Sequence, residues 1–177
     1  LGRCSADDIV LVNVNAAPIP DAGQNAFICY GQTYTLQGSG GVQYTWTPST
    51  YLSSTTGATP VSSPSKSIIY TLAKVIDANG CESLITDDIV VDVTPPIKVT
   101  TFPYDTIGYP GDQFELKAVA AVPNANIFSW SPATRLSNGN IFNPIVTIGN
   151  INDDVVYQVT ASTTAGCKGE GYVRVRV

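Results

Sequence analysis

The chain of 177 residues contains four Cys, no His and no Met, and its formal net charge is -5 at pH 7. Because His is the commonest general base and the commonest ligand of Zn²⁺, this composition excludes triads with a His base and most transition-metal sites. With 9 Lys and Arg against 14 Asp and Glu, and no basic run, the chain is also unsuited to binding nucleic acid.

Hydrophobic residues make up 44% of the chain, which is enough for a folded core, yet no apolar stretch approaches the roughly 20 residues that span a bilayer. The sequence starts at Leu1 without the basic and apolar segments of a signal peptide. We therefore expect an internal piece of a longer, exported protein. Many β-branched residues are typical of secreted β-proteins, and four Cys favour an oxidising compartment.

A partial pattern opens the chain and two complete copies follow it. Cys4 and the apolar run after it match Cys81 and the run at 89–93, so residues 1–17 are predicted to be the last strand of a preceding module. The first complete copy is predicted at 18–95 and the second at 96–177. Such repetition predicts a tandem array of homologous modules.

The two copies share their most distinctive residues in the same order. Each copy begins with a predicted strand that follows a Gly and ends at a Leu, and an aromatic–small–Trp–small–Pro run comes next. A Tyr in a later strand and a Gly–Cys pair before a Val-rich strand complete the pattern. These positions are Leu36, Trp46, Tyr70 and Cys81 in the first copy, and Leu116, Trp130, Tyr157 and Cys167 in the second.

Short strands are predicted throughout both copies. Val173, Val175 and Val177 alternate with Arg174 and Arg176, and this period of two buries one face of a strand. Turn-forming residues separate the apolar runs, and no stretch carries the apolar stripe of a helix. Several short strands in about 80 residues predict an antiparallel β-sandwich of immunoglobulin type.

The ordered pattern of Cys, Leu, Trp–small–Pro, Tyr and Gly–Cys resembles the PKD-like, immunoglobulin-like repeats of very large bacterial surface proteins. Such repeats are common in gliding bacteria with type IX secretion, and the resemblance covers nearly the whole chain. It implies tandem all-β sandwich modules in an elongated array, within an extracellular, outer-membrane-attached filamentous adhesin or stalk. In the second copy Tyr109 stands in the position of Cys29, which is a departure from the family pattern.

The positions of the cysteines suggest how they pair. In a seven-strand up-and-down path, Cys29 lies in the turn at one end of its module and Cys81 lies at the other end. About 15 to 20 Å would then separate them, beyond the roughly 4.4 to 6.8 Å between the Cα atoms of a disulfide. We predict an intermodule bond from Cys29 to Cys167, with the partners of Cys4 and Cys81 in upstream modules. An intramodule Cys29–Cys81 bond, which a non-standard first strand would permit, stays open.

Aromatic and apolar residues shared by the copies are predicted to be core residues. Trp46 and Trp130 could instead stack on sugar rings, but their common position within strands favours the core. Tyr70, Tyr157, Leu36 and Leu116 are assigned to the core in the same way.

Acidic residues offer the only metal site that this composition allows. Asp77, Asn79, Asp87 and Asp88 could supply oxygen ligands to Ca²⁺, but the spacing of a known calcium loop is missing. A solvated acidic edge that discourages aggregation is favoured, and no other cofactor is expected.

Two classes of function remain after an enzyme is set aside. Glycoside hydrolysis needs only two carboxylates, but Glu82, Glu115 and Glu170 lie in turns or strands that wall no cleft. The favoured function is a stiff spacer in cell-surface adhesion, with gliding motility as the context. Its partners would be neighbouring modules of the same chain, and surface polysaccharide or other cell-surface proteins. The alternative is a carbohydrate- or protein-binding module that uses the loops 49–66 or 137–155.

Overall fold

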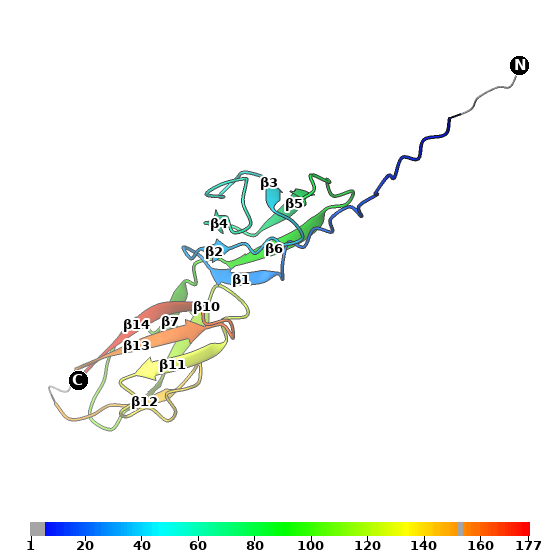
Figure 1. The fold of residues 1–177 in the computed structure, drawn as a ribbon. Coiled ribbons are helices and arrows are strands. Elements are labelled where there is room, and N and C mark those ends of the chain that lie inside the picture. The colour runs from blue at the N-terminus through cyan, green and yellow to red at the C-terminus, as the bar shows by residue number, and fades with distance from the viewer. Residues whose placement is uncertain (1–5, 152–153) are drawn as a thin grey trace, which may run out of the picture. The chain divides into compact units, whose positions relative to one another are not determined.

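The computed structural model describes residues 6–151 and 154–177, and the regular elements in these ranges are β-strands (Figure 1). This confirms the all-β fold. Within the same ranges, no helix is long and apolar enough to cross a membrane. The strands are β1 (Ala26–Cys29), β2 (Tyr34–Thr35), β3 (Gln43–Thr47), β4 (Val61–Ser62), β5 (Ile68–Ile76), β6 (Asp87–Thr94), β7 (Val99–Phe102), β8 (Asp105–Ile107), β9 (Gln113–Glu115), β10 (Lys117–Ala120), β11 (Ile127–Ser131), β12 (Ile145–Thr147), β13 (Val155–Ser162) and β14 (Lys168–Arg176).

The strands of the first copy form a four-stranded sheet in the order β1-β6-β5-β3 and a two-stranded sheet of β2 and β4. β3 runs antiparallel to β5, with Trp46 opposite Leu72. β1 runs parallel to β6, and Cys29 lies opposite Thr94. Parallel pairing brings the carboxyl ends of β1 and β6 to the same edge of the sheet.

The second copy repeats this arrangement. Its four-stranded sheet has the order β11-β13-β14-β8, and two further pairs are β10 with β7 and β12 with β9. β13 and β14 are antiparallel, with Tyr157 opposite Val173. β14 and β8 are parallel, with Arg176 opposite Ile107. Each copy therefore contains one parallel pair, β1 with β6 in the first and β8 with β14 in the second.

Contacts between residues divide the chain into two compact units. One contains the residues up to Gln24, Thr35–Val61 and Tyr70–Ile89, and the other contains Asn25–Tyr34, Ser62–Ile69 and Val90–Val177. This division does not follow the repeat, since β1 and the second half of β6 are grouped with the residues of the second copy. The module boundaries 18–95 and 96–177 stay a prediction.

Each unit has an apolar core of its own. In the first unit, large side chains with less than 2% exposure form the core, and they include Leu36, Tyr70, Leu72, Val75 and Ile89. Burying one such side chain contributes about 1.5–3 kcal/mol to folding. In the second unit, the core cluster comprises Leu116, Ala118, Trp130, Val146, Ile148, Tyr157, Val159, Val173 and Val175.

The residues before the first complete copy form no strand in the described range from 6 to 17. Their apolar side chains are exposed, with Ile9 at 92% and Val14 at 89%. A lone strand has no partner for its backbone N–H and C=O groups. The prediction that residues 1–17 complete a preceding module stays a prediction, and Cys4 lies outside the described residues.

Candidate functional site

The predicted bond between Cys29 and Cys167 is confirmed. Their Cα atoms are 5.4 Å apart, within the usual range for a disulfide, and 138 positions separate them in the sequence. The alternative Cys29–Cys81 bond is wrong. Cys29 lies opposite Thr94 at the carboxyl end of β6, whereas Cys81 comes before β6 begins and has a free thiol.

The turn that presents Cys167 is fixed by three hydrogen bonds. The Thr163 N–H donates to the Cys167 carbonyl oxygen at 2.9 Å, and the Gly166 N–H donates to the Thr163 carbonyl oxygen at 3.0 Å. The Cys167 N–H donates to the Thr163 hydroxyl oxygen at 3.1 Å. Gly166 has a φ of 86°, which favours glycine there.

Cys81 sits in a turn of the same construction. The Asp77 N–H donates to the Cys81 carbonyl oxygen at 3.0 Å, and the Gly80 N–H donates to the Asp77 carbonyl oxygen at 3.1 Å. The Cys81 N–H donates to Asp77 Oδ1 at 2.8 Å, where a carboxylate takes the part of the Thr163 hydroxyl. The backbone therefore holds Cys81 and Cys167 in turns of the same kind, although only Cys167 forms a disulfide.

Apolar residues pack around the disulfide. Ile97, Ala125 and Cys167 form a buried cluster against which Cys29 and Val122 pack, and Cys167 is 3% exposed. All of them belong to the second compact unit. A hollow of about 250 Å³ beside the disulfide is lined by Cys29, Tyr30, Thr94, Pro95, Pro96, Ile97, Cys167 and Lys168.

The backbone of Ile97 crosses β14 at a glycine. A Cβ atom on Gly169 would collide with the Ile97 carbonyl oxygen and carbonyl carbon, so any larger residue there displaces one segment. Sequence reasoning did not assign a role to Gly169, Ile97 or Ala125. A glycine two positions after Cys167, inside a Val-rich strand, was the available signal, because glycine in a strand marks a close backbone approach.

The turn after β1 has a counterpart after β8. The Gln32 N–H donates to the Cys29 carbonyl oxygen at 3.0 Å, and the Asp112 N–H donates to the Tyr109 carbonyl oxygen at 3.0 Å. This pattern matches Tyr109 to Cys29.

The strand register gives a different match. The Tyr30 N–H donates to the Thr94 carbonyl oxygen at 2.9 Å, and the Gly108 N–H donates to the Arg176 carbonyl oxygen at 3.1 Å. Ile107 thus occupies the strand position of Cys29. The second copy has a longer path between strand and turn, and both of the matching positions lack a thiol.

Both tryptophans are buried, with exposures of 2% for Trp46 and 3% for Trp130. The indole N–H of Trp46 donates to the Gly57 carbonyl oxygen at 2.9 Å, and that of Trp130 donates to the Ile141 carbonyl oxygen at 2.8 Å. Buried rings expose no face on which a sugar could stack.

Both tyrosines tie a strand to a preceding loop. The Tyr70 hydroxyl donates to the Thr50 carbonyl oxygen at 2.8 Å, and the Tyr157 hydroxyl donates to the Thr134 carbonyl oxygen at 2.9 Å. Burial raises the pKa of Tyr157 above its ordinary 10.0, against a smaller lowering by Arg135. The folded state therefore holds the Tyr157 proton to a higher pH than the unfolded chain does. The contribution of this group to folding stability is fully present below pH 10, and it is lost as pH rises through the raised pKa.

The loops that follow the two tryptophans are more alike than the sequence indicated. The Leu36 N–H donates to the Pro60 carbonyl oxygen, and the Leu116 N–H donates to the Pro144 carbonyl oxygen. Each loop also has a positive-φ residue other than glycine at the same place, namely Tyr51 and Arg135. The loops that follow the two tryptophans therefore share hydrogen bonds and backbone conformation as far as β4 and β12.

Two of the four candidate Ca²⁺ ligands, Asp77 and Asp87, accept hydrogen bonds from the backbone. Asp77 Oδ1 accepts from the N–H groups of Asn79 and Cys81, at 2.9 and 2.8 Å. Asp87 Oδ2 accepts from the Ala22 N–H at 2.7 Å. Across the described residues, no three His, Cys, Asp or Glu side chains gather as a metal site.

The three glutamates weighed for glycoside hydrolysis have different partners. Glu82 pairs with Lys74 Nζ at 2.9 Å, and Glu115 Oε1 accepts from Asn143 at 2.7 Å. Glu170 accepts from the Tyr172 hydroxyl at 2.9 Å, and this hydrogen bond is the main reason that the pKa of Tyr172 is raised. These contacts do not bring the three carboxylates to one place.

Known proteins match this chain in fold. No family model matches it, and no curated protein matches its sequence. The titin I-band fragment I67-I69 matches with a TM-score of 0.54 at 15% identity, over 93% of this chain and 66% of that fragment. The IG1+IG2 structure of DIP-gamma matches with 0.51 at 12% identity, over 92% of this chain and 98% of that one.

The immunoglobulin domains 1-5 of Sidekick-1 give a TM-score of 0.50 at 14% identity, over 92% of this chain and 39% of theirs. The chain thus spans less than two thirds of the titin fragment and of the Sidekick-1 structure. Identities this low show the fold alone. They confirm that the sandwich is immunoglobulin-like, and the DIP-gamma match extends over a pair of such domains.

Proposed function

We propose that the chain is a structural repeat segment of an extracellular filamentous adhesin, acting as a stiff stalk or spacer in cell-surface adhesion and gliding motility. The observation that carries this proposal is the Cys29–Cys167 disulfide. With the module boundaries predicted from the repeat, this bond links one copy covalently to the next.

The surroundings of the disulfide support a stiff joint. Pro95 and Pro96 lie between the copies, and proline fixes φ and favours an extended chain. The close approach of Ile97 to Gly169 holds the segment that follows these prolines against β14, the strand that begins beside Cys167.

The disulfide also supports a location outside the cytoplasm, because such bonds persist in oxidising compartments. An outer-membrane-attached filament with type IX secretion fits the resemblance to PKD-like repeats. Its partners would be neighbouring modules of the same chain, together with surface polysaccharide or other cell-surface proteins.

A carbohydrate- or protein-binding module has less support. The indole rings are buried, and the first halves of the long loops are held by the same hydrogen bonds in both copies. Loops that perform the same structural task leave less freedom for a ligand site. Glycan binding that is abolished by exchanging these loops would replace the spacer proposal.

The spacer proposal is tested by the spread of distances between the copies. Fluorophores on noncanonical amino acids would replace Ser49 and Ala133, which are exposed and occupy matching turns. Single-molecule energy transfer should give one narrow distribution for the oxidised chain and a broader one for Cys29→Ser. The Cys81→Ser variant is the matched control and should keep the narrow distribution. Equal widths for Cys29→Ser and the parent chain would contradict a stiff joint.

A further inference from the structure

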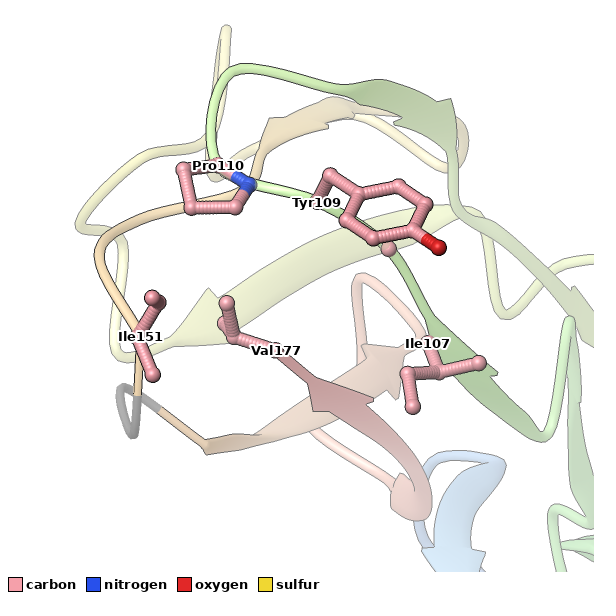
Figure 2. A pocket seen from close by; sticks show the side chains of 6 residues that line it. Ile107, Tyr109, Pro110, Ile151 and Val177 are labelled. Atoms are coloured by element: carbon pink, nitrogen blue, oxygen red, sulfur yellow. The ribbon is translucent and has the colours of Figure 1, made fainter.

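An apolar hollow lies where β8 and β14 end, in the second copy (Figure 2). It has a volume of about 350 Å³ and is lined by Ile107, Gly108, Tyr109, Pro110, Ile151 and Val177. Ile107 is 67% exposed, Tyr109 is 81% exposed and Ile151 is 74% exposed. Large apolar side chains that are this exposed and lie together indicate a binding surface. We call this surface the Ile107 end.

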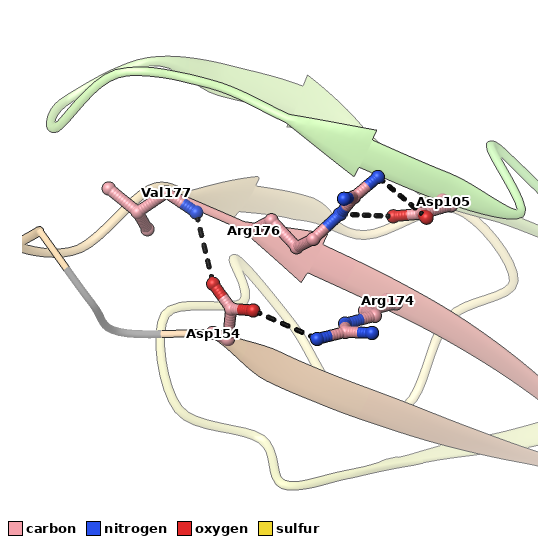
Figure 3. Close-up of polar contacts among 5 residues, drawn as sticks. All are labelled: Asp105, Asp154, Arg174, Arg176 and Val177. Atoms are coloured by element: carbon pink, nitrogen blue, oxygen red, sulfur yellow. Dashed lines mark hydrogen bonds and ion pairs between the residues drawn. The ribbon is translucent and has the colours of Figure 1, made fainter.

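Ion pairs hold the strand ends that border the hollow (Figure 3). Arg176 binds Asp105 through two nitrogen atoms, at 3.1 and 2.8 Å. Asp154 accepts from Arg174 at 3.1 Å and from the Val177 N–H at 3.3 Å. The Ile107 end therefore has an apolar centre and charged groups at its border, which is the usual composition of a protein interface.

The matching surface of the first copy, which we call the Cys29 end, comprises the carboxyl ends of β1 and β6. There Cys29 lies opposite Thr94, as Ile107 lies opposite Arg176 at the other surface. At the Cys29 end, the turn that carries Cys167 is bonded to Cys29, and Cys29 packs against the cluster that includes Cys167. The backbone that receives this turn is present again at the Ile107 end.

We propose that the Ile107 end docks the Gly–Cys turn of a further module of the same repeat. The proposal rests on the spacer function and extends it. Ile107 and Tyr109 replace the thiol at the two positions that match Cys29, so this second joint is held by apolar contact without a disulfide. A filament of this kind would alternate covalently locked joints with joints that can open.

A chain extended by one module tests the proposal. Arg176 matches Thr94 in the strand register, so Val177 matches Pro95. A second copy of residues 96–177 placed directly after Val177 therefore reproduces the spacing at the joint between the two copies. The appended segment contains the complete core cluster of the second copy. Ile107→Cys in the original second copy then offers a thiol to the Cys167 turn of the appended module.

Non-reducing peptide mapping of this extended chain should recover a disulfide between position 107 and the appended Cys167. The control is Ile127→Cys, a half-exposed position opposite Ser162, at the far end of β13 from Val155. We expect about tenfold less disulfide from the control, because tethered thiols react well only where the geometry lets them meet.

A second variant, Tyr109→Cys, covers the other position that matches Cys29. Failure of both variants to cross-link, or equal cross-linking by the Ile127 control, would overturn the docking proposal. An appended module that remains sensitive to trypsin throughout would overturn it too, since docking must protect its fold. The distance spread between Ser49 and Ala133 is set by the first joint, so failure here leaves the test of the spacer proposal intact.

Discussion

The Cys29 end and the Ile107 end share a backbone and differ in chemistry. At each, a short parallel strand finishes beside the last strand of its copy, and the next N–H group donates to that strand's terminal carbonyl oxygen. One end carries Cys29, whose sulfur is bonded to that of Cys167, and the other carries Ile107 and Tyr109 beside ion pairs. The backbone is thus alike at the two ends, and the side chains at the positions of Cys29, Ile107 and Tyr109 decide which end carries a covalent bond.

The largest expected effect comes from removing the covalent bond. Cys29→Ser should lower the free energy of unfolding by about 2–5 kcal/mol, because the bond closes a long loop and restricts the unfolded chain. Urea unfolding, with and without reductant, measures this. Cys81→Ser should unfold like the parent chain, and a loss below about 0.5 kcal/mol for Cys29→Ser would show that the two ends do not differ in this way.

A smaller loss is expected where Ile97 crosses β14. Gly169→Ala should destabilise the protein by about 1–3 kcal/mol, because its methyl group collides with the Ile97 backbone. Thermal unfolding measures the loss, and Lys168→Ala, at the exposed neighbouring position, is the control. Unchanged stability in Gly169→Ala would contradict the close approach of the Ile97 backbone to β14.

The common framework of the two copies is tested by their tyrosines. Tyr70→Phe and Tyr157→Phe each remove a hydroxyl that donates to a loop carbonyl, and each should cost about 1 kcal/mol. Urea unfolding of the pair should give similar losses, while Tyr109→Phe, at an exposed position, should give none. A loss confined to one copy would show that the loops after Trp46 and Trp130 are held differently.

The smallest effect concerns the border of the Ile107 end. Arg176→Gln breaks the pair with Asp105, whose side chains are 43% and 36% exposed, so the loss should stay below about 1 kcal/mol. The difference from the parent chain should shrink in high salt, because exposed charges are screened. A loss that salt leaves unchanged would point to packing by the arginine stem instead.

Much of the fold could be predicted from the sequence because the repeat exposes the residues that matter. Trp46 and Trp130 recur within the same run, and two strand positions shared at that spacing favour a core residue. Strand length separates Cys29 from Cys81 in an up-and-down path and so favoured the Cys29–Cys167 bond, while a non-standard first strand left the other pairing open.

Other features depend on contacts that no local pattern records. The up-and-down path that we expected does not include a parallel pair of β1 and β6. This pairing places Cys29 opposite Thr94, where the chain leaves the first copy. Differing side chains hid the resemblance between the loops after the tryptophans, which backbone hydrogen bonds maintain. The Ile107 end could not be predicted from the sequence, because Ile151 and Val177 lie far from Ile107 in the chain and meet it only in the fold. The sequence marked Tyr109 only as a residue in the position of a cysteine.

The disulfide has a mechanical consequence when the chain is pulled from its two ends. Tension entering through the residues before β1 reaches Cys29, crosses to Cys167 and leaves along β14. The disulfide bypasses the segment between the two cysteines, whose sequence separation is 138, so this segment carries no load along its backbone. Fully extended at roughly 3.5 Å per residue, this segment would be about 480 Å long. Because the disulfide bypasses it, unfolding of the segment under force does not lengthen the chain by that distance.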